Sequence, residues 1–182
     1  MTVVGIFVGG ASSRMGGRPK GLLPTANGET VLERTIRIAQ TVSPQIVLVG
    51  RSDAYRTSVL TLSDPVGTSG PLGGLCSLLE YSGDDRAVAL ACDMPFITPD
   101  LLRRLAIAPS TARAVLPKRE GLWEPFFARF DAKRALPFVR SRLASRSGAL
   151  QGLFDDLEAD ELPLGPTEAR LLSDWDSPED MR

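Results

Sequence analysis

The feature that most constrains the fold is an alternation of short apolar runs with segments of helical periodicity. Residues 3–8 (VVGIFV) are apolar and largely β-branched and end at a glycine pair, which indicates a buried strand that leads into a loop. Residues 45–49 (QIVLV) have the same character. Between them, residues 30–40 place apolar side chains at helical spacing, and Thr30 with Glu33 forms the pattern of a capping box. This stretch therefore predicts a βαβ unit.

The alternation continues, which predicts a parallel sheet with helices on both faces. The further helices are expected over residues 74–81, 99–105, 132–145 and 147–154, the last capped by Ser147, and the further strands over residues 86–91, 112–116 and 123–129. The second half predicts at least one antiparallel strand. We expect an α/β three-layer sandwich whose ligands bind at the carboxyl ends of the parallel strands.

Composition limits the classes of function that the chain can have. With 182 residues, of which 43% are hydrophobic, the chain suits one domain spanning residues 1–182. The formal net charge of -1 favours neither nucleic acid nor an anionic membrane as a partner. Cys76 and Cys92 lack CxxC spacing and the N-terminus lacks a signal-peptide pattern, so we expect a reduced cytoplasmic protein. The chain has no histidine, which excludes Ser-His-Asp and Cys-His catalysis and imidazole metal sites.

A long glycine-rich loop follows the first predicted strand. Residues 9–21 read GGASSRMGGRPKG, which matches neither a P-loop nor a dinucleotide-binding GxGxxG motif. Its glycines, Gly9 and Gly10 among them, would let backbone amides approach a ligand. Amide donors combined with cations suit a triphosphate, whereas a solvated surface loop is the structural alternative. The polar side chains that would serve the phosphates are Ser12, Ser13, Arg14 and Lys20.

Carboxylates supply the candidate metal ligands. Asp93 directly follows the apolar run that ends at Ala91, where it would hold Mg²⁺ on phosphate oxygens, although an aspartate before Pro95 also suits a turn or an N-cap. Near the C-terminus, Asp174 and Asp176 would project to the same side of an extended segment, so either would serve as a further oxygen ligand. Ser177, which follows, has the pattern of an ordinary helix start.

A second glycine-rich segment, residues 70–74 (GPLGG), follows Asp64. Its backbone would pack against a base or a ribose before a helix begins. Taken alone, the segment is equally well explained as a Gly/Pro turn.

Four motifs together resemble the molybdenum cofactor guanylyltransferases of the MobA type, which have the Rossmann-like nucleotide-diphospho-sugar transferase fold. They are GGxSxRMGxxPKGLL at residues 9–23, GPLxGL at 70–75, CDxPF at 92–96 and a terminal xDSPED at 175–180. The resemblance implies transfer of GMP from Mg-GTP to the phosphate of molybdopterin, with release of pyrophosphate. It implies an N-terminal half that binds the nucleotide and a C-terminal half that binds the acceptor.

The resemblance also implies roles for individual residues. The backbone of Val8, Gly9 and Gly10 would meet guanine, Lys20 would bind the triphosphate and Asp93 would hold magnesium. Asp64, Gly70 and Gly74 would contribute to the nucleotide site, with the loop at residues 70–74 closing on base and ribose.

The chain departs from the family pattern at two places. Asp174 and Asp176 stand where members commonly have an Asn-x-Asn, and the asparagine that often follows the second strand is replaced by Gly50 or Arg51. Alternative functions are a cytidylyltransferase, a sugar-phosphate nucleotidyltransferase and a non-catalytic nucleotide-binding regulatory protein.

The acceptor has no local signature in the sequence. The side chains considered for its site are Arg119, Trp123, Arg140, Arg142 and Arg146. Partners implied by the resemblance are GTP, a molybdopterin-type acceptor and, transiently, cofactor-biosynthesis proteins or molybdoenzyme chaperones.

Overall fold

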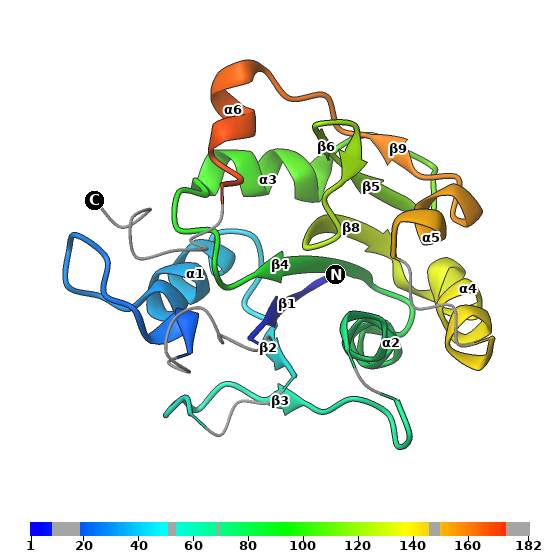
Figure 1. Ribbon diagram of the computed structural model, residues 1–182, viewed down its shortest axis with the longest axis horizontal. Coiled ribbons are helices and arrows are strands. Elements are labelled where there is room, and N and C mark those ends of the chain that lie inside the picture. The colour runs from blue at the N-terminus through cyan, green and yellow to red at the C-terminus, as the bar shows by residue number, and fades with distance from the viewer. Residues whose placement is uncertain (9–18, 51–53, 69, 146–149, 174–182) are drawn as a thin grey trace.

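A computed structural model describes residues 1–8, 19–50, 54–68, 70–145 and 150–173. Its main feature is a seven-stranded sheet in the order β3-β2-β1-β4-β8-β5-β9 (Figure 1). The strands are β1 (Thr2–Phe7), β2 (Ile46–Val49), β3 (Thr61–Leu62), β4 (Arg86–Ala91), β5 (Ala114–Leu116), β8 (Phe127–Asp131) and β9 (Asp160–Glu161). The first four lie parallel to one another, whereas β8 runs antiparallel to both β4 and β5.

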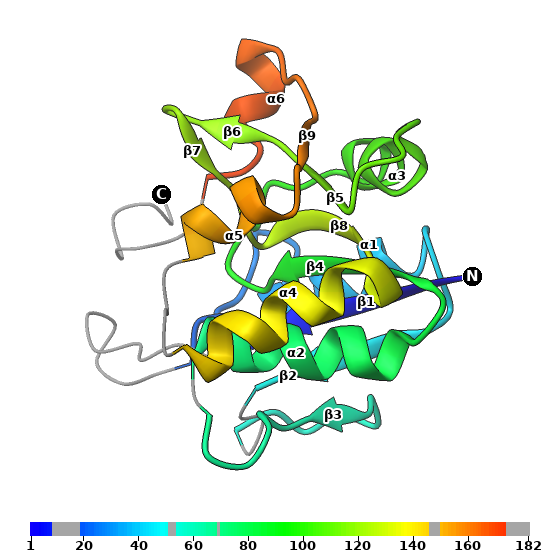
Figure 2. The same cartoon turned by 90° about the vertical axis from the view of Figure 1, so that its right-hand side faces the viewer.

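Helices cover both faces of the sheet, as Figures 1 and 2 show. One face carries α1 (Val31–Ala39) and α3 (Pro99–Ile107). The other carries α2 (Pro71–Ser82) and α4 (Ala132–Ala144), together with α5 (Leu150–Asp156). The smaller elements are the 3₁₀ helix η2 (Lys20–Leu22), the hairpin of β6 (Lys118–Arg119) and β7 (Leu122–Trp123), and α6 (Pro166–Arg170).

The two hydrophobic layers follow from the twofold period of the strands. In β1, Val4 and Ile6 belong to the core under α1 and α3, whereas Val3 and Phe7 belong to the core under α2 and α4. Because β1 is buried on both faces, its sequence is a continuous apolar run rather than an alternating one. The predicted three-layer α/β architecture, with a mostly parallel sheet and an antiparallel strand, is confirmed.

The first predicted helix is also confirmed in its detail. Glu33 donates its backbone N–H to the Thr30 hydroxyl oxygen at 3.2 Å, and the Glu33 carboxylate accepts from the Thr30 backbone N–H at 2.7 Å. This is the reciprocal capping box that the sequence predicts.

Most predicted elements differ from the observed ones by a few residues at their ends, and two differences have a clear local cause. The strand expected over residues 123–129 is divided, because Pro125 has no N–H and the Phe127 N–H turns back to the Glu124 carbonyl at 3.2 Å. Helix α2 begins at Pro71, three residues before its predicted start at 74, with Pro71 in its first turn and Gly70 as N-cap. The helix start predicted at Ser147 and the one at Ser177 lie outside the described residues.

Five short elements, η2, β3, β6, β9 and α6, were not predicted, since runs of two to five residues carry no periodicity. Within the described ranges, no helix combines the length and apolar character that crossing a bilayer requires.

Candidate active site

The carboxyl ends of β1, β2 and β4 meet at one edge of the sheet. In the strand register, Phe7 is paired with both Val49 and Ala91. Beyond this row, the Val8 N–H donates to the Val49 carbonyl at 3.0 Å, and the Cys92 N–H donates to the Phe7 carbonyl at 3.1 Å. The segments that follow the three strands therefore start side by side, as expected for ligand sites in parallel sheets.

Lys20 and Asp93 lie in direct contact at this edge. The Lys20 ammonium is 3.1 Å from Oδ2 of Asp93, although 73 positions separate the two residues in the sequence. Their side chains are 21% and 27% exposed, so the pair is reachable from solvent yet partly desolvated. The residue predicted to bind the triphosphate, Lys20, is thus in contact with the residue predicted to bind the metal, Asp93.

Tyr55 lies next to the backbone of Gly21 and the thiol of Cys92, the neighbours of Lys20 and Asp93, and sequence reasoning missed it. It is buried, and a Cβ built on Gly21 would lie 2.9 Å from the Tyr55 hydroxyl oxygen. Burial raises the pKa of the Tyr55 hydroxyl, with a contribution from Cys92, while its hydrogen bond with the Gly21 backbone opposes the rise. Tyr55 therefore stays neutral and joins the segment of Lys20 to the segment of Asp93. Tyr55 stands alone among polar residues, so no sequence pattern would have identified it.

The thiol of Cys92 is part of the same packing. Burial raises its pKa to about 12, with Asp93 as the next contribution. The thiol stays protonated and adds no charge to the site.

Asp64 lies against the first turn of α2. A Cβ on Gly73 would lie 3.3 Å from the carboxyl carbon of Asp64, and one on Gly74 would lie 3.6 Å from Asp64 Oδ1. A Cβ on Gly74 would also lie 2.8 Å from Val49 Cγ1, which is closer than real contacts allow. Gly74 is therefore a helical residue that permits α2 to pack against β2. Gly70, the N-cap, has a φ of 88°, which favours glycine.

The predicted site residues within the described ranges are Val8, Lys20, Asp64, Gly70, Gly74 and Asp93. Gly70 lies at the N-terminus of α2, and each of the other five makes a contact that links it to this edge of the sheet. Their individual roles toward a nucleotide stay predictions. Gly9, Gly10, Ser12, Ser13, Arg14 and Asp176 lie outside the described residues, and their roles also stay predictions.

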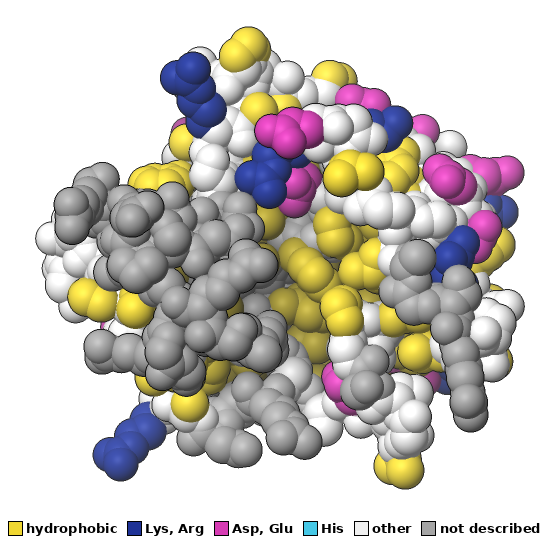
Figure 3. Space-filling view, in the orientation of Figure 1, with side chains coloured by type: hydrophobic (Ala, Val, Ile, Leu, Met, Phe, Trp, Pro, Cys, Tyr) yellow, Lys and Arg dark blue, Asp and Glu magenta, His cyan; other side chains and the backbone are white. Residues whose placement is uncertain are grey.

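The antiparallel direction of β8 brings the second half of the chain to the same edge. Phe127, at the start of β8, is paired with Leu90 near the carboxyl end of β4, and the Phe126 carbonyl accepts from the Ala91 N–H at 2.8 Å. The Phe126 ring lies 4.6 Å from the ring of Phe7, centroid to centroid. In Figure 3 this face of the molecule is hollowed near its centre, and hydrophobic side chains line the hollow.

The side chains considered for the acceptor have distinct surroundings. Trp123 is half-buried, with the Lys118 ammonium 4.2 Å from its ring centroid. Gln151 holds the Trp123 backbone by accepting from its N–H and donating to its carbonyl, each at 2.9 Å. Three of the arginines are engaged with carboxylates: Arg119 with Glu124, Arg140 with Glu80 and Arg142 with Asp156. Arg146 lies outside the described residues.

The donor set fits a magnesium ion that is held mainly by a nucleotide. Asp93 offers hard oxygen ligands, and within the described residues no group of three or more Cys, Asp or Glu side chains converges. Mg²⁺ commonly takes one or two carboxylates and completes its shell with phosphate oxygens and water. The site therefore suits a metal whose other ligands come from a triphosphate.

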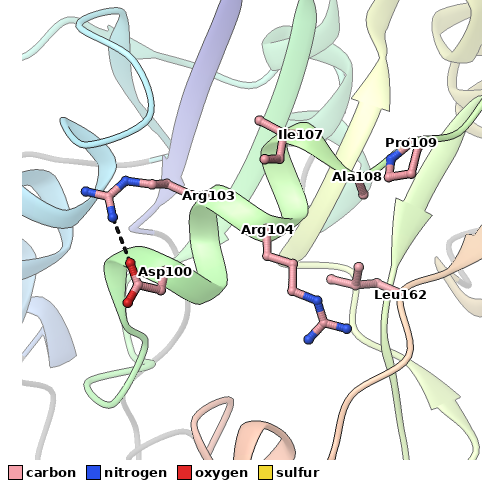
Figure 4. A pocket seen from close by; sticks show the side chains of 7 residues that line it. All are labelled: Asp100, Arg103, Arg104, Ile107, Ala108, Pro109 and Leu162. Carbon is pink, nitrogen blue, oxygen red and sulfur yellow. Dashed lines mark hydrogen bonds and ion pairs between the residues drawn. The ribbon is translucent and has the colours of Figure 1, made fainter.

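A pocket of about 550 Å³ lies elsewhere, along α3 (Figure 4). Its lining residues are Asp100, Arg103, Arg104, Ile107, Ala108, Pro109 and Leu162, none of them a predicted site residue. Arg103 pairs with Asp100 at 2.8 Å, and Arg104 binds the carboxylate of Glu168 and the carbonyl of Pro163. Because no predicted site residue lines this pocket, we place the chemistry at the strand edge instead.

Comparison with known proteins agrees with this geometry. Residues 4–159 match the model of the MobA-like NTP transferase domain. A molybdenum cofactor guanylyltransferase of Pseudomonas putida is 32% identical over 96% of this chain and 92% of its own length. A probable molybdenum cofactor guanylyltransferase of Synechococcus elongatus is 30% identical over 96% of this chain and 97% of its own length.

A solved structure shows the same fold. The crystal structure of molybdopterin-guanine dinucleotide biosynthesis protein A from Archaeoglobus fulgidus superposes with a TM-score of 0.81 at 22% identity, covering 100% of this chain and 95% of that one. The match of the family model over most of the chain, joined to this fold and to the residues gathered at the strand edge, shows that the chain belongs to the MobA-like NTP transferase family.

Proposed function

We propose that this protein is a molybdenum cofactor guanylyltransferase, which transfers GMP from Mg-GTP to the phosphate of molybdopterin and releases pyrophosphate. The observation that carries the proposal is the meeting of Lys20 and Asp93 at the carboxyl ends of β1 and β4. Family membership and the names of the relatives support the choice of this transfer over others.

Each of these two residues has a chemical task. The Lys20 ammonium would bind phosphate oxygens and offset charge that builds up on the departing pyrophosphate. The Asp93 carboxylate would hold magnesium, which when bound neutralises phosphate charge and polarises the phosphorus that is attacked. Asp64 and the first turn of α2 would line the part of the site that binds the nucleotide.

The reaction itself needs no protein base. A phosphate oxygen of the acceptor forms a new bond to the α-phosphorus of GTP, and the bond from that phosphorus to the bridging oxygen of the β-phosphate breaks. The leaving pyrophosphate takes the electron pair of the broken bond. Because the attacking phosphate is already an anion near pH 7, positioning and charge stabilisation suffice, in keeping with a chain that has no histidine.

The acceptor would enter from the second half of the chain. Phe126 reaches the strand edge through its contact with Phe7, and Lys118 lies over the indole ring of Trp123. An aromatic surface with a nearby cation suits a flat heterocycle that carries a phosphate. We place the activity in the cytoplasm, where the free thiols Cys76 and Cys92 would stay reduced.

Pyrophosphate release tests the proposal. The purified protein is incubated with magnesium, molybdopterin and, in separate reactions, GTP, CTP or ATP, and each reaction is repeated without molybdopterin. We expect acceptor-dependent release from GTP that exceeds release from CTP and ATP at least about a hundredfold. Equal or faster release from CTP would identify a cytidylyltransferase. Binding of GTP without release under any condition would indicate a regulatory protein.

A further inference from the structure

The contact between Lys20 and Asp93 has a consequence for the order in which ligands bind. The ammonium of Lys20 lies 3.1 Å from Oδ2 of the carboxylate that the proposed function assigns to magnesium. An ammonium at that distance occupies one of the electron pairs through which a carboxylate would bind a metal. It also places a positive charge where a second cation would have to enter.

We propose that Lys20 acts as a placeholder on Asp93, so that the divalent cation binds the free protein weakly and is taken up together with the nucleotide. When the triphosphate arrives, its oxygens attract the Lys20 ammonium, the ion pair with Asp93 opens, and the carboxylate becomes available to the cation. Lys20 thereby couples the binding of metal and nucleotide. This inference rests on the proposed function only in that a nucleoside triphosphate is the ligand that draws Lys20 away.

Two further observations favour this exchange. Within the described residues, Asp93 does not belong to a group of three or more Cys, Asp or Glu side chains that could hold a metal. The free protein therefore offers the cation a poor ligand set until phosphate oxygens are added. Tyr55 is buried between the two segments that carry the pair, next to the backbone of Gly21 and the thiol of Cys92. The Lys20 side chain is partly exposed, so it can rotate toward a triphosphate while the segment that carries Asp93 stays in place.

The test measures metal binding to the nucleotide-free protein. Mn²⁺, which takes the same oxygen ligands as Mg²⁺, is titrated while its free concentration is followed by electron paramagnetic resonance. The variants are Lys20→Met and Lys20→Gln, which remove the ammonium, and Lys133→Met as the control. Lys133 also pairs with an aspartate, Asp84 at 2.8 Å, but that pair lies near the opposite end of β4.

We expect both Lys20 variants to bind Mn²⁺ at least about tenfold more tightly than the unmodified protein, a coupling within the range usual for linked sites. Lys133→Met should leave the affinity unchanged. Adding Asp93→Asn to Lys20→Met should abolish the gain. If both Lys20 variants bind Mn²⁺ with unchanged or weaker affinity, the placeholder role is wrong.

A second titration tests the coupling and separates this inference from the proposed function. With a non-hydrolysable GTP analogue present, Mn²⁺ affinity of the unmodified protein should rise, and it should rise by a smaller factor in Lys20→Met. An equal rise in both proteins would overturn the inference. Failure of the proposed function would instead appear as absent guanylyl transfer in the pyrophosphate assay, which the metal titration of the nucleotide-free protein does not involve.

Discussion

Replacing Asp93 with asparagine should separate catalysis from stability. The substitution keeps the shape of the side chain while removing the negative charge that would hold magnesium. In the folded protein the same charge pairs with Lys20, so the variant also loses an ion pair. The two effects have different expected sizes, and both are measurable.

The structure limits the stability effect of Asp93→Asn. The paired side chains are 21% and 27% exposed, and a pair that solvent still reaches contributes about 1 kcal/mol or less. For a chain of 182 residues, that loss lowers the thermal midpoint by roughly 2–4 °C. Loss of one contact that stabilises transition-state charge costs on the order of a hundred- to thousandfold in turnover, or about 3–4 kcal/mol.

Two assays check these values. Turnover is followed as pyrophosphate release in saturating magnesium, and the midpoint is followed by circular dichroism. Asp84→Asn, which removes the carboxylate of the ion pair with Lys133, is the matched control and should keep its turnover. Turnover of Asp93→Asn within about threefold of the unmodified protein would refute the metal-binding role. A loss of turnover explained by unfolding, seen as a midpoint lowered by far more than a few degrees, would refute the argument about the pair.

Two further substitutions and one thiol-labelling experiment test the packing of the protein. Gly74→Ala puts a methyl group 2.8 Å from Val49 Cγ1, so α2 must shift, and we expect a loss of about 1–3 kcal/mol in denaturant unfolding; an unchanged midpoint would contradict the packing. Arg129 is 4% exposed and donates to the Ala108 carbonyl at 2.5 Å, so Arg129→Met should cost about 2 kcal/mol in the same assay, whereas equal stability would show that this contact is dispensable. Burial raises the pKa of Cys76 to about 11 and that of Cys92 to about 12, so neither should react with a thiol reagent at pH 8 until the protein is unfolded; rapid labelling of the native protein would be the opposing result.

Sequence reasoning predicted the parts of the site that depend on short-range pattern. The run of residues 86–91 and the carboxylate after it placed Asp93 at the end of a buried strand, since strand type and direction follow from local apolar content and connection length. The capping box of Thr30 and Glu33 likewise depends only on residues three apart.

Features that depend on tertiary packing were not predictable. Nothing near Tyr55 in the sequence indicates that its hydroxyl lies between Gly21 and Cys92. The direct contact of Lys20 with Asp93 joins two segments that the sequence assigned to separate tasks, phosphate binding and metal binding. The division of the strand at Pro125 was missed because apolar and aromatic residues on both sides of the proline preserve a strand-like composition.

The reversal of direction at β8 also has an evolutionary consequence. Because β8 runs antiparallel to β4, the stretch between β5 and β8, with its hairpin of β6 and β7, lies at the edge of the sheet where β1, β2 and β4 end. Its residues take no part in the register of β1, β2 and β4. This stretch can therefore lengthen, shorten or change its side chains while β1, β2 and β4 keep their register. We expect a hairpin grafted from a relative at residues 117–126 to alter acceptor preference while leaving the choice of nucleotide unchanged.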